Sequence, residues 1–387
     1  MKFLLIIKNT IKKYVPTFIF KRLAIIRFYI LNIFNFKEIK ALYKKYLLFL
    51  KNKPQNTKSI LFFPSDPIQV SPASRFRCYF IAKHLRSKGI FTAVVSTKLT
   101  RHQRKKILKI INPDWVWIQK VYHPLNRYKF FKEYNILFDI DDADFFLDHL
   151  RKSIHEFYKN SKIITCGSEF IKKYAEKFSN NVYKIWTPFP VNKNKKFKSQ
   201  YKKQIIIGWT PRNADAYYES IKQLYKPLLN LHNRYNIIFR IIGGNVNKVK
   251  KLFSNLDWVQ IIPSQPYNIF LKILNKIDIG IHPLTKTPHN LAKSFGKTLT
   301  YMNAGIVCVV SNIGENSIFF KDGVNGFLAN TAEEWEIKLG KLIENQSLRE
   351  KFADKAYKNI QEYLSLDTVG NKYIELLFGS GKKTLKN

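Results

Sequence analysis

The sequence is short of cysteines and acidic residues, and each shortage excludes a class of protein. Three cysteines, Cys78, Cys166 and Cys308, are scattered over 387 residues, without a Cys-x-x-Cys pair or a cluster of cysteine and histidine. Such a set provides neither a disulfide framework nor a zinc site, and it favours a reducing cytoplasm. Only 27 Asp and Glu stand against 67 Lys and Arg, which gives a formal net charge of +40. This excess favours anionic partners, although part of it also fits a solvated surface in a Lys-rich chain.

The sequence also lacks an uninterrupted apolar run of about 20 residues, so no transmembrane helix is predicted. Residues 1–53 contain thirteen Lys and Arg and a single acid, Glu38, interleaved with aromatic and aliphatic residues. This mixture is typical of a helix that lies in a membrane interface, with its bases on anionic headgroups and its apolar side chains in the acyl boundary. The alternative is an amphipathic helix packed on the protein's own core.

The remaining composition is that of a globular protein, with 45% hydrophobic and 15% aromatic residues. Two domains are expected at this length, because a single hydrophobic core rarely serves more than about 250–300 residues. Short apolar runs rich in β-branched residues alternate with segments of helical period, which predicts parallel sheets covered by helices. The predicted strands are residues 60–63, 93–95, 115–118, 136–138, 163–164, 182–185, 205–207, 237–242, 259–262, 277–281 and 307–310.

We therefore predict an α/β protein with two Rossmann-like, doubly wound parallel sheets that face each other across a cleft. Two capping boxes, Thr331–Glu334 and Ser347–Glu350, predict the starts of two helices near the carboxyl end. The predicted parts are a basic amphipathic extension (1–55), a first domain (56–190), a linker (191–203), a second domain (204–365) and a C-terminal helix and tail (366–387).

The segment after the predicted strand 277–281 has the strongest pattern of a binding site. A helix is predicted to begin near Lys293 and to end at Gly305. The amino end of a helix carries unpaired N–H groups and the positive pole of the dipole, and Lys293 and Lys297 add two full charges there. A diphosphate would be stabilised at this place. The alternative is that both lysines are ordinary solvated bases, and their spacing does not separate the two interpretations.

The same segment resembles the donor-binding half of the GT-B glycosyltransferases of family four. The resemblance is clear over residues 277–365 and looser over residues 57–190. It implies a glycosyltransferase of the hexosyltransferase type that uses a nucleotide-diphosphate sugar, needs neither a metal nor another cofactor, and retains the anomeric configuration. The matching motifs are His282-Pro-Leu284, Lys293-Ser-Phe-Gly-Lys297, Tyr301-Met-Asn-Ala-Gly305, Val310-Ser-Asn-Ile-Gly314 and Asp322-Gly-Val-Asn-Gly-Phe-Leu328.

The resemblance also implies which residues bind the donor. The family's turn beneath the donor phosphates matches residues 207–212, so Arg212 would complete a clamp of three cations. Many members carry two glutamates around the following helix, whereas Ala292 and Thr300 occupy those positions here, and Thr300 would bond a ribose or sugar hydroxyl. Gly244 would let a nucleobase or ribose approach the backbone, with a plain turn as the alternative. The predicted donor-binding residues are Gly208, Thr210, Arg212, Gly244, Lys293, Ser294, Lys297, Thr300 and Ser311.

Three carboxylates follow a strand of the first predicted domain, in Phe138-Asp-Ile-Asp-Asp-Ala143, and similar runs mark this branch of the family. Clustered carboxylates raise one another's pKa, so Asp141 or Asp142 would act as acid or base toward an acceptor hydroxyl. Asp139 would bind the acceptor. A divalent metal and a helix cap are the alternatives.

An Arg-x-Arg segment, Arg75 to Arg77, resembles one that the family has at the mouth of the cleft. The two arginines would hold an acceptor phosphate, pair with the aspartates, or do both. His123, His149 and His282 are the histidines closest to predicted strand ends, with structural or catalytic roles as the alternatives.

These features predict transfer of a sugar to a glycan or lipid-linked acceptor in cell-surface polysaccharide biosynthesis. The expected partners are the nucleotide sugar, the acceptor and an anionic inner leaflet, with a cytoplasmic and membrane-peripheral location and no nucleic acid. One alternative is a catalytically degenerate scaffold of the same fold, which the missing glutamates favour. The other is a basic nucleic-acid-binding protein, which lacks the support of any zinc-finger, RNA-recognition or basic-zipper pattern.

Overall fold

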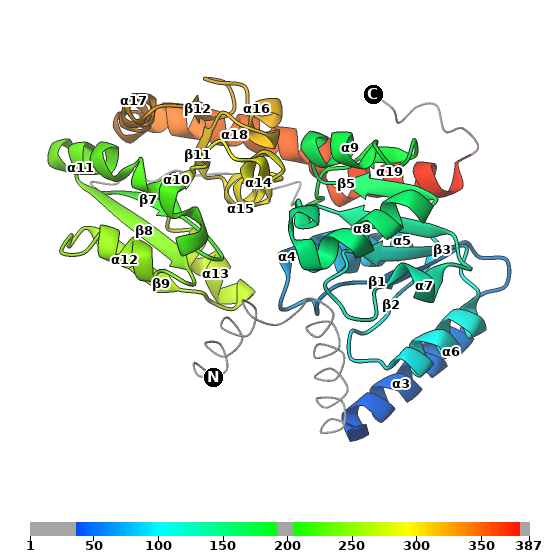
Figure 1. Ribbon diagram of the computed structural model, residues 1–387. Coiled ribbons are helices and arrows are strands. Elements are labelled where there is room, and N and C mark those ends of the chain that lie inside the picture. The colour runs from blue at the N-terminus through cyan, green and yellow to red at the C-terminus, as the bar shows by residue number, and fades with distance from the viewer. Residues whose placement is uncertain (1–35, 192–203, 380–387) are drawn as a thin grey trace. The chain divides into compact units, whose positions relative to one another are not determined.

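The computed structural model describes residues 36–191 and 204–379, which form two units (Figure 1). The first unit contains the described residues up to 166, residues 174–183 and the chain from residue 374 onward. The second contains residues 167–173 and the described residues between 184 and 373. Residues 167–173 and 184–190 therefore group with the second unit, although the sequence suggests the first domain. Residues 1–35 of the predicted membrane-interface extension (1–55), residues 192–203 of the predicted linker (191–203) and residues 380–387 of the predicted tail lie outside the described residues.

Each unit is built on a six-stranded sheet, which confirms the predicted α/β class with two Rossmann-like domains. The first sheet has the order β2-β1-β3-β4-β5-β6, and its pairs β1–β2, β1–β3, β3–β4 and β4–β5 are parallel. The residues of β1, β3, β4 and β5 are all buried, which explains why these strands are nearly continuous apolar runs. The strands are β1 (Ser59–Phe63), β2 (Phe91–Val94), β3 (Trp115–Gln119), β4 (Ile136–Ile140), β5 (Ile163–Cys166) and β6 (Val182–Lys184).

The helices of the first unit include α6 (Arg101–Ile111), which shows how local sequence sets an element's ends. Thr100 caps it by accepting the Gln103 N–H at 3.3 Å, and the Gln103 side chain accepts the Thr100 N–H at 2.9 Å. Asn112 ends it in a left-handed conformation. The other helices of this unit are α3 (Phe36–Lys51), α4 (Pro72–Ser74), a π-helix (Arg75–Phe80), α5 (Ile81–Ser87), α7 (Tyr128–Phe131), a 3₁₀ turn (Asp144–Phe146) and α8 (Asp148–Asn160). The residues of α9 (Glu169–Ala175) and α19 (Leu366–Phe378) are divided between the two units.

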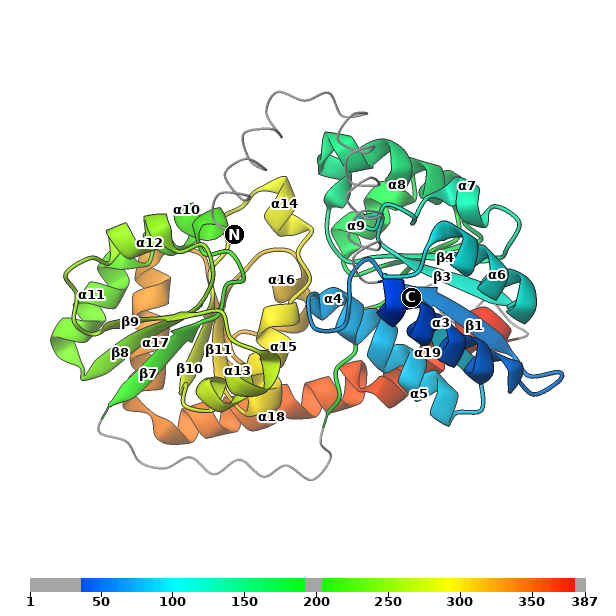
Figure 2. The same ribbon diagram turned by 90° about the horizontal axis from the view of Figure 1, so that it is seen from below.

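The second sheet has the order β12-β11-β10-β7-β8-β9, and its five pairs are parallel. Figure 2 shows α11 and α17 on one side of this sheet and α13 and α15 on the other. The three-residue strand β12 is too short to stand out in the sequence and is missing from the predicted strands. The strands are β7 (Ile205–Trp209), β8 (Ile237–Gly243), β9 (Val259–Pro263), β10 (Ile279–His282), β11 (Val307–Ser311) and β12 (Phe327–Ala329).

The helices of the second unit confirm two predicted boundaries and correct two others. The Thr331 cap is confirmed, because its hydroxyl accepts the Glu334 N–H at 3.2 Å, and so is the left-handed Gly305 at the end of α15. The predicted start at Lys293 is wrong, because the chain first forms α14, and α15 begins only at Gly296. The helices are α10 (Tyr218–Lys222), α11 (Tyr225–Arg234), α12 (Asn247–Leu252), α13 (Tyr267–Leu274), α14 (Pro288–Leu291), α15 (Gly296–Ala304), α16 (Glu315–Phe319), α17 (Ala332–Glu344) and α18 (Gln346–Leu364), with a 3₁₀ turn at Asp215–Tyr217.

The predicted cap at Ser347 is also wrong. A single residue, Asn345, separates α17 from α18, so it must serve as the cap, and its side chain accepts the Leu348 N–H at 2.9 Å. Across the part of the chain that the structure describes, no helix is long and apolar enough to cross a membrane.

Candidate functional site

The carboxyl end of β10 is a buried polar site in the second unit. The strand ends at His282, which is 2% exposed and whose Nδ1 lies 3.4 Å from the amide nitrogen of Asn316. The next turn is fixed by Ser311, whose hydroxyl accepts the Leu284 N–H at 2.8 Å. Ser311, predicted to bind the donor, is thus buried and shapes the turn that leads away from His282.

The two lysines of the predicted phosphate clamp both lie within electrostatic range of His282. Lys297 stands in the first turn of α15, and Lys293 lies in the turn between α14 and α15. Burial of the imidazole, together with the charges of Lys297 and Lys293, lowers the pKa of His282 to about 3. The imidazole is therefore neutral at physiological pH, and the positive charge at this strand end resides on the lysines.

The segment after β7 reaches the same lysines. The Nζ atom of Lys297 lies 3.9 Å from the centroid of the Tyr217 ring, which is cation–π geometry. The Arg212 side chain is exposed on this segment. Thr210, half-buried, follows the end of β7. The loops that follow β7 and β10 therefore meet at Lys297, as the predicted clamp requires, while no described contact joins Arg212 to it.

The predicted glycines have packing roles. The Gly208 carbonyl, inside the sheet, accepts the Tyr301 hydroxyl at 3.1 Å. The Gly244 N–H donates to the Arg212 carbonyl at 3.3 Å, and its carbonyl accepts the Ala214 N–H at 2.9 Å. Both backbone groups of Gly244 are thus used to join two loops. These contacts agree with the alternative of a turn, and the approach of a nucleobase or ribose to Gly244 stays a prediction.

The positions where many family members carry glutamates are also engaged. Ala292 is fully buried, and its carbonyl accepts the Ser168 hydroxyl at 2.9 Å. The Thr300 hydroxyl lies 3.5 Å from the Gly296 carbonyl, one turn earlier in α15, and its side chain is half-buried. Ser294 is half-buried between the two lysines. Thr300 and Ser294 are thus half-buried hydroxyls close in sequence to the cations, whereas Thr298, next to Lys297, is fully buried and donates to the Phe295 carbonyl at 2.6 Å.

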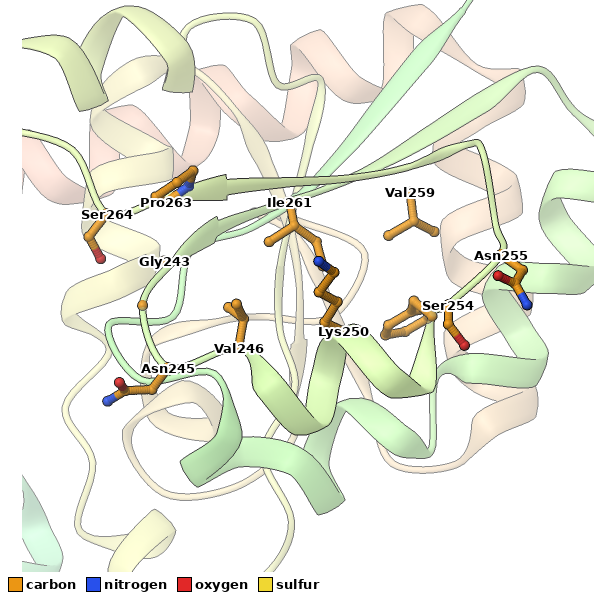
Figure 3. A pocket seen from close by; sticks show the side chains of 12 residues that line it. Gly243, Asn245, Val246, Lys250, Ser254, Asn255, Val259, Ile261, Pro263 and Ser264 are labelled. Atoms are coloured by element: carbon orange, nitrogen blue, oxygen red, sulfur yellow. The ribbon is translucent and has the colours of Figure 1, made fainter. Parts of the chain in front are cut away.

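A pocket of about 640 Å³ opens between α12 and the edge strand β9 (Figure 3). Its floor is the apolar side of β9, and the Lys250 side chain extends from α12 toward Ile261. Among its lining residues the sequence pointed only to Gly244, because the others come from three elements and form no motif. The lining residues are Gly243, Gly244, Asn245, Val246, Lys250, Phe253, Ser254, Asn255, Val259, Ile261, Pro263 and Ser264.

The carboxyl edge of the first sheet holds a different cluster, centred on a lysine that the sequence does not single out. Lys120 follows β3 with a left-handed φ of 55°. Its Nζ lies 2.6 Å from Asp142, 2.9 Å from Asp141 and 3.5 Å from Asp144, and its side chain is 6% exposed. Burial lowers the pKa of Lys120, but the three carboxylates outweigh burial, and the pKa lies well above its ordinary value.

The three carboxylates differ in access. The Tyr122 hydroxyl donates to Asp144 at 2.8 Å, and burial raises the pKa of Asp144 to about 6 against the opposing effect of Lys120. The side chains of Asp141 and Asp144 are 10% and 6% exposed, whereas that of Asp142 is 30% exposed. Asp142 is therefore the predicted catalytic carboxylate that a second molecule can reach.

A buried ion pair lies beneath this cluster. Arg77 donates to Asp139 through Nε at 2.8 Å and Nη2 at 2.6 Å, and both side chains are fully buried. Thr165 donates to the same carboxylate at 2.7 Å. The predicted pairing of Arg77 with Asp139 is confirmed. The other predicted role, direct contact with an acceptor, has no support, because neither side chain reaches the surface.

Arg75 and His123 have local roles. Arg75 is 9% exposed and donates to the carbonyls of Ile68 and Gln69 at 3.0 and 3.4 Å, so it fixes that loop. His123 is buried, with Nε2 3.0 Å from the Thr97 carbonyl, and burial and Arg104 lower its pKa. His149 is half-buried on α8. Within residues 36–191 and 204–379, no three His, Cys, Asp or Glu are grouped so as to hold a metal ion.

Comparisons with known proteins bear on both units. The family model described as "Glycosyl transferases group 1" matches residues 192–359. HepE from Anabaena, solved with UDP and glucose, has 12% identity and a TM-score of 0.61 over 83% of this chain and 99% of its own. A glycosyltransferase from Rickettsia africae has 17% identity and a TM-score of 0.61 over 84% of this chain and 100% of its own. Sucrose-phosphate synthase from Thermosynechococcus elongatus has 7% identity and a TM-score of 0.61 over 83% and 98%.

Among curated proteins, none shows significant sequence similarity to the chain. At identities this low, the likeness to solved structures shows the fold, which is the predicted GT-B pair of Rossmann-like domains.

Proposed function

We propose that the protein is a glycosyltransferase, because residues 192–359 match the model of the glycosyl transferases group 1 family and the chain has the GT-B fold. It transfers a sugar from a nucleotide-diphosphate sugar to a glycan or lipid-linked acceptor in cell-surface polysaccharide biosynthesis, with retention of configuration. One observation carries the proposal: the charges of Lys293 and Lys297 both act on a buried, neutral His282 at the carboxyl end of β10. Fixed cations at a partly dry strand end stabilise the charge that develops on a departing diphosphate.

In the proposed donor site, the lysines would neutralise the diphosphate and His282 would orient the sugar. Lys297, in the first turn of α15, adds its charge to the helix dipole, and Lys293 supplies a second cation. If the Asn316 amide donates to Nδ1 of His282, the neutral ring carries its proton on Nε2. That N–H would donate to a hydroxyl of the transferred sugar. Arg212, exposed after β7, would supply the third cation of the clamp.

The pocket between α12 and β9 would take the nucleobase. Its loops begin at the carboxyl ends of β8 and β9, and the Gly244 backbone is bonded to Arg212, at the loop proposed to lie beneath the phosphates. Ligands of open α/β sheets bind at such strand ends. HepE, which is similar in fold, was solved with UDP and glucose, so uridine sugars are the first donors to test.

The acceptor would approach Asp142. A carboxylate accepts hydrogen bonds from sugar hydroxyls, and here one lysine is shared among three carboxylates. This surplus of negative charge disfavours a phosphate at that edge, so the reacting end of the acceptor would be a hydroxyl-bearing sugar. No metal or other cofactor is part of the proposed reaction. The basic residues 1–53 would keep the protein in the cytoplasm on the inner face of the membrane.

A second candidate is a degenerate scaffold with the same fold. Ala292 and Thr300 favour it, because neither offers a carboxylate for a donor ribose and both are engaged in contacts within the second unit. Such a scaffold would not release nucleotide from any sugar donor.

Incubation of the purified protein with UDP-, GDP- and CMP-sugars, with released nucleotide as the readout, separates the two candidates. We expect release from one donor, a large loss of release in Lys297→Ala and no change in Lys351→Ala, an exposed lysine of α18. Proton NMR of the product would test retention. Absence of both nucleotide binding and release across the panel would select the scaffold.

A further inference from the structure

Helices α3 and α6 lie side by side in the first unit (Figure 1). Their exposed faces are strongly basic. Against this charge the two helices hold a single acid, Glu38, which lies 3.7 Å from the exposed Lys98. The exposed cations are Lys37, Lys40, Lys44, Lys45 and Lys51 of α3 and Arg101, Lys105, Lys106 and Lys109 of α6.

The inner faces of both helices fix this surface to the domain. Ile39 and Leu50 of α3 are 4% and 1% exposed, and Ile107 and Leu108 of α6 are 0% and 1% exposed. Burial of these side chains turns the lysines outward, because residues three or four positions apart share one side of a helix. The cations therefore stand on a firmly packed surface, which we call the basic platform.

Two large aliphatic side chains stand exposed among the cations. Leu48 is 67% exposed and lies one turn after Lys44 and one turn before Lys51. Ile110 is 46% exposed and lies one turn after Lys106. A single exposed aliphatic residue needs no explanation. Two of them on adjacent helices, each with lysine one turn away, give the platform both components of a membrane-binding surface.

The charge of the platform is not balanced by acidic residues of the described chain. In the described parts of the chain, none of these nine cations forms an ion pair, whereas lysines elsewhere do, such as Lys338 with Asp322 at 3.0 Å. The residues before α3 add seven Lys and Arg and no acid before residue 36. Anionic phospholipid would supply the missing counter-charge.

We propose that the basic platform docks on an anionic lipid bilayer, with its lysines at the headgroups and with Leu48 and Ile110 in the boundary below them. The proposal rests on the proposed function only for its purpose, which is to bring the domain to a lipid-linked acceptor. Nucleic acid is also anionic, but a phosphodiester backbone has no apolar layer for Leu48 and Ile110.

Sedimentation of the full chain with vesicles tests the platform. The probe is a mixture of phosphatidylcholine and phosphatidylglycerol, with pure phosphatidylcholine as the reference. Lys105→Gln/Lys106→Gln/Lys109→Gln should weaken binding to the mixed vesicles on the order of 100-fold, from the typical effect of each lysine near a charged surface. The matched control, Lys351→Gln/Lys355→Gln/Lys358→Gln on α18, changes the net charge equally and should retain most of the binding.

The contribution of Leu48 and Ile110 to vesicle binding is tested at high salt, where the attraction between lysines and headgroups is screened. Leu48→Gln/Ile110→Gln should lower the remaining binding, whereas Ile337→Gln, which removes a 50% exposed residue of α17, should not. Equal losses in the two lysine variants, or no binding by the parent protein, would overturn the proposal. So would vesicle binding that survives in the α6 variant while its binding to duplex DNA is lost.

Nucleotide binding, measured on the same variants, separates this proposal from the proposed function. Unchanged affinity for UDP or GDP in the α6 variant shows that it is folded. A protein that binds vesicles through the platform but binds no nucleotide would support the platform and contradict the proposed function.

Discussion

The carboxyl edges of the two sheets carry opposite charge. In the first unit, Lys120 is surrounded by three carboxylates, and only Asp142 among them is well exposed. In the second, the charges of Lys293 and Lys297 act on a buried His282. Both edges belong to six-stranded, Rossmann-like sheets, so each unit has an equivalent position for a ligand at the carboxyl ends of its strands. In the proposed function, these side chains would suit one edge to sugar hydroxyls and the other to a diphosphate.

The largest expected effect is the loss of stability when the buried ion pair at the first edge is broken. Arg77→Met leaves Asp139 buried without its partner, which should cost about 3–5 kcal/mol of unfolding free energy. Urea denaturation measures the loss. As the control, Lys358→Met removes an exposed pair with Asp354, 2.8 Å apart, and should cost less than about 1 kcal/mol. Similar costs for the two variants would show that the buried pair does not support the edge.

The next prediction distinguishes the two edges by the ligand that each would bind. Lys297→Met removes a cation from the second edge and should weaken nucleotide-diphosphate binding by about 1.5–3 kcal/mol, the usual range for a charged hydrogen bond. Asp142→Asn changes the first edge and should leave that affinity unaltered while it lowers transfer to acceptor. Calorimetry with UDP and GDP measures both variants. Equal loss in the two would contradict the division of roles.

Because of His282 at the second edge, the free energy of unfolding should increase as the pH rises. His282 has a folded pKa of about 3 against an ordinary value of 6.5, so the unfolded chain binds its proton first as the pH falls. This group should therefore cost about 2 kcal/mol of stability between pH 6.5 and pH 5. His282→Gln should remove that part of the slope in urea denaturation at the two pH values. An unchanged slope would place the histidine in an ordinary environment.

Asp144 at the first edge should have a smaller and opposite effect, so that its contribution to the free energy of unfolding decreases as the pH rises. The folded pKa of Asp144 is about 6 against an ordinary 3.8, so the folded state binds this proton first. Its contribution should rise by about 1 kcal/mol as the pH falls from 6.5 to 5 and be lost again as the pH rises through 6. Asp144→Asn should abolish this gain in the same denaturation series, with Asp148→Asn, an exposed residue of α8, as the control.

The sequence was sufficient for the strands and for part of the second edge. Strands buried on both faces are read from apolar runs, and only the three-residue β12 escaped. Lys293 and Lys297 could be named from their motif and their place before a helix. The start of that helix could not, because Thr287 caps α14 first by accepting the Asn290 N–H at 3.2 Å.

The first edge was harder to predict, because its key contacts depend on strand order. Lys120 is one lysine in a Lys-rich chain, and its partners lie beyond the end of the neighbouring strand β4. Asp141 and Asp142 were visible as a run of acids, but which of them is exposed depends on the fold. The glycine at Gly244 was noticed, yet only the structure shows that its backbone is bonded to Arg212 and Ala214.

The account depends most on the charge beside His282, and titration of that histidine by NMR tests it directly. Histidine-labelled protein would be followed from pH 4 to pH 8 without and with UDP or GDP, and His282→Gln would assign the signal. We expect a His282 that stays neutral over this range in the free protein and shifts its resonance, with a raised pKa, when the diphosphate offsets the lysines. A His282 that titrates near its ordinary pKa of 6.5 and does not respond to either nucleotide would contradict the account.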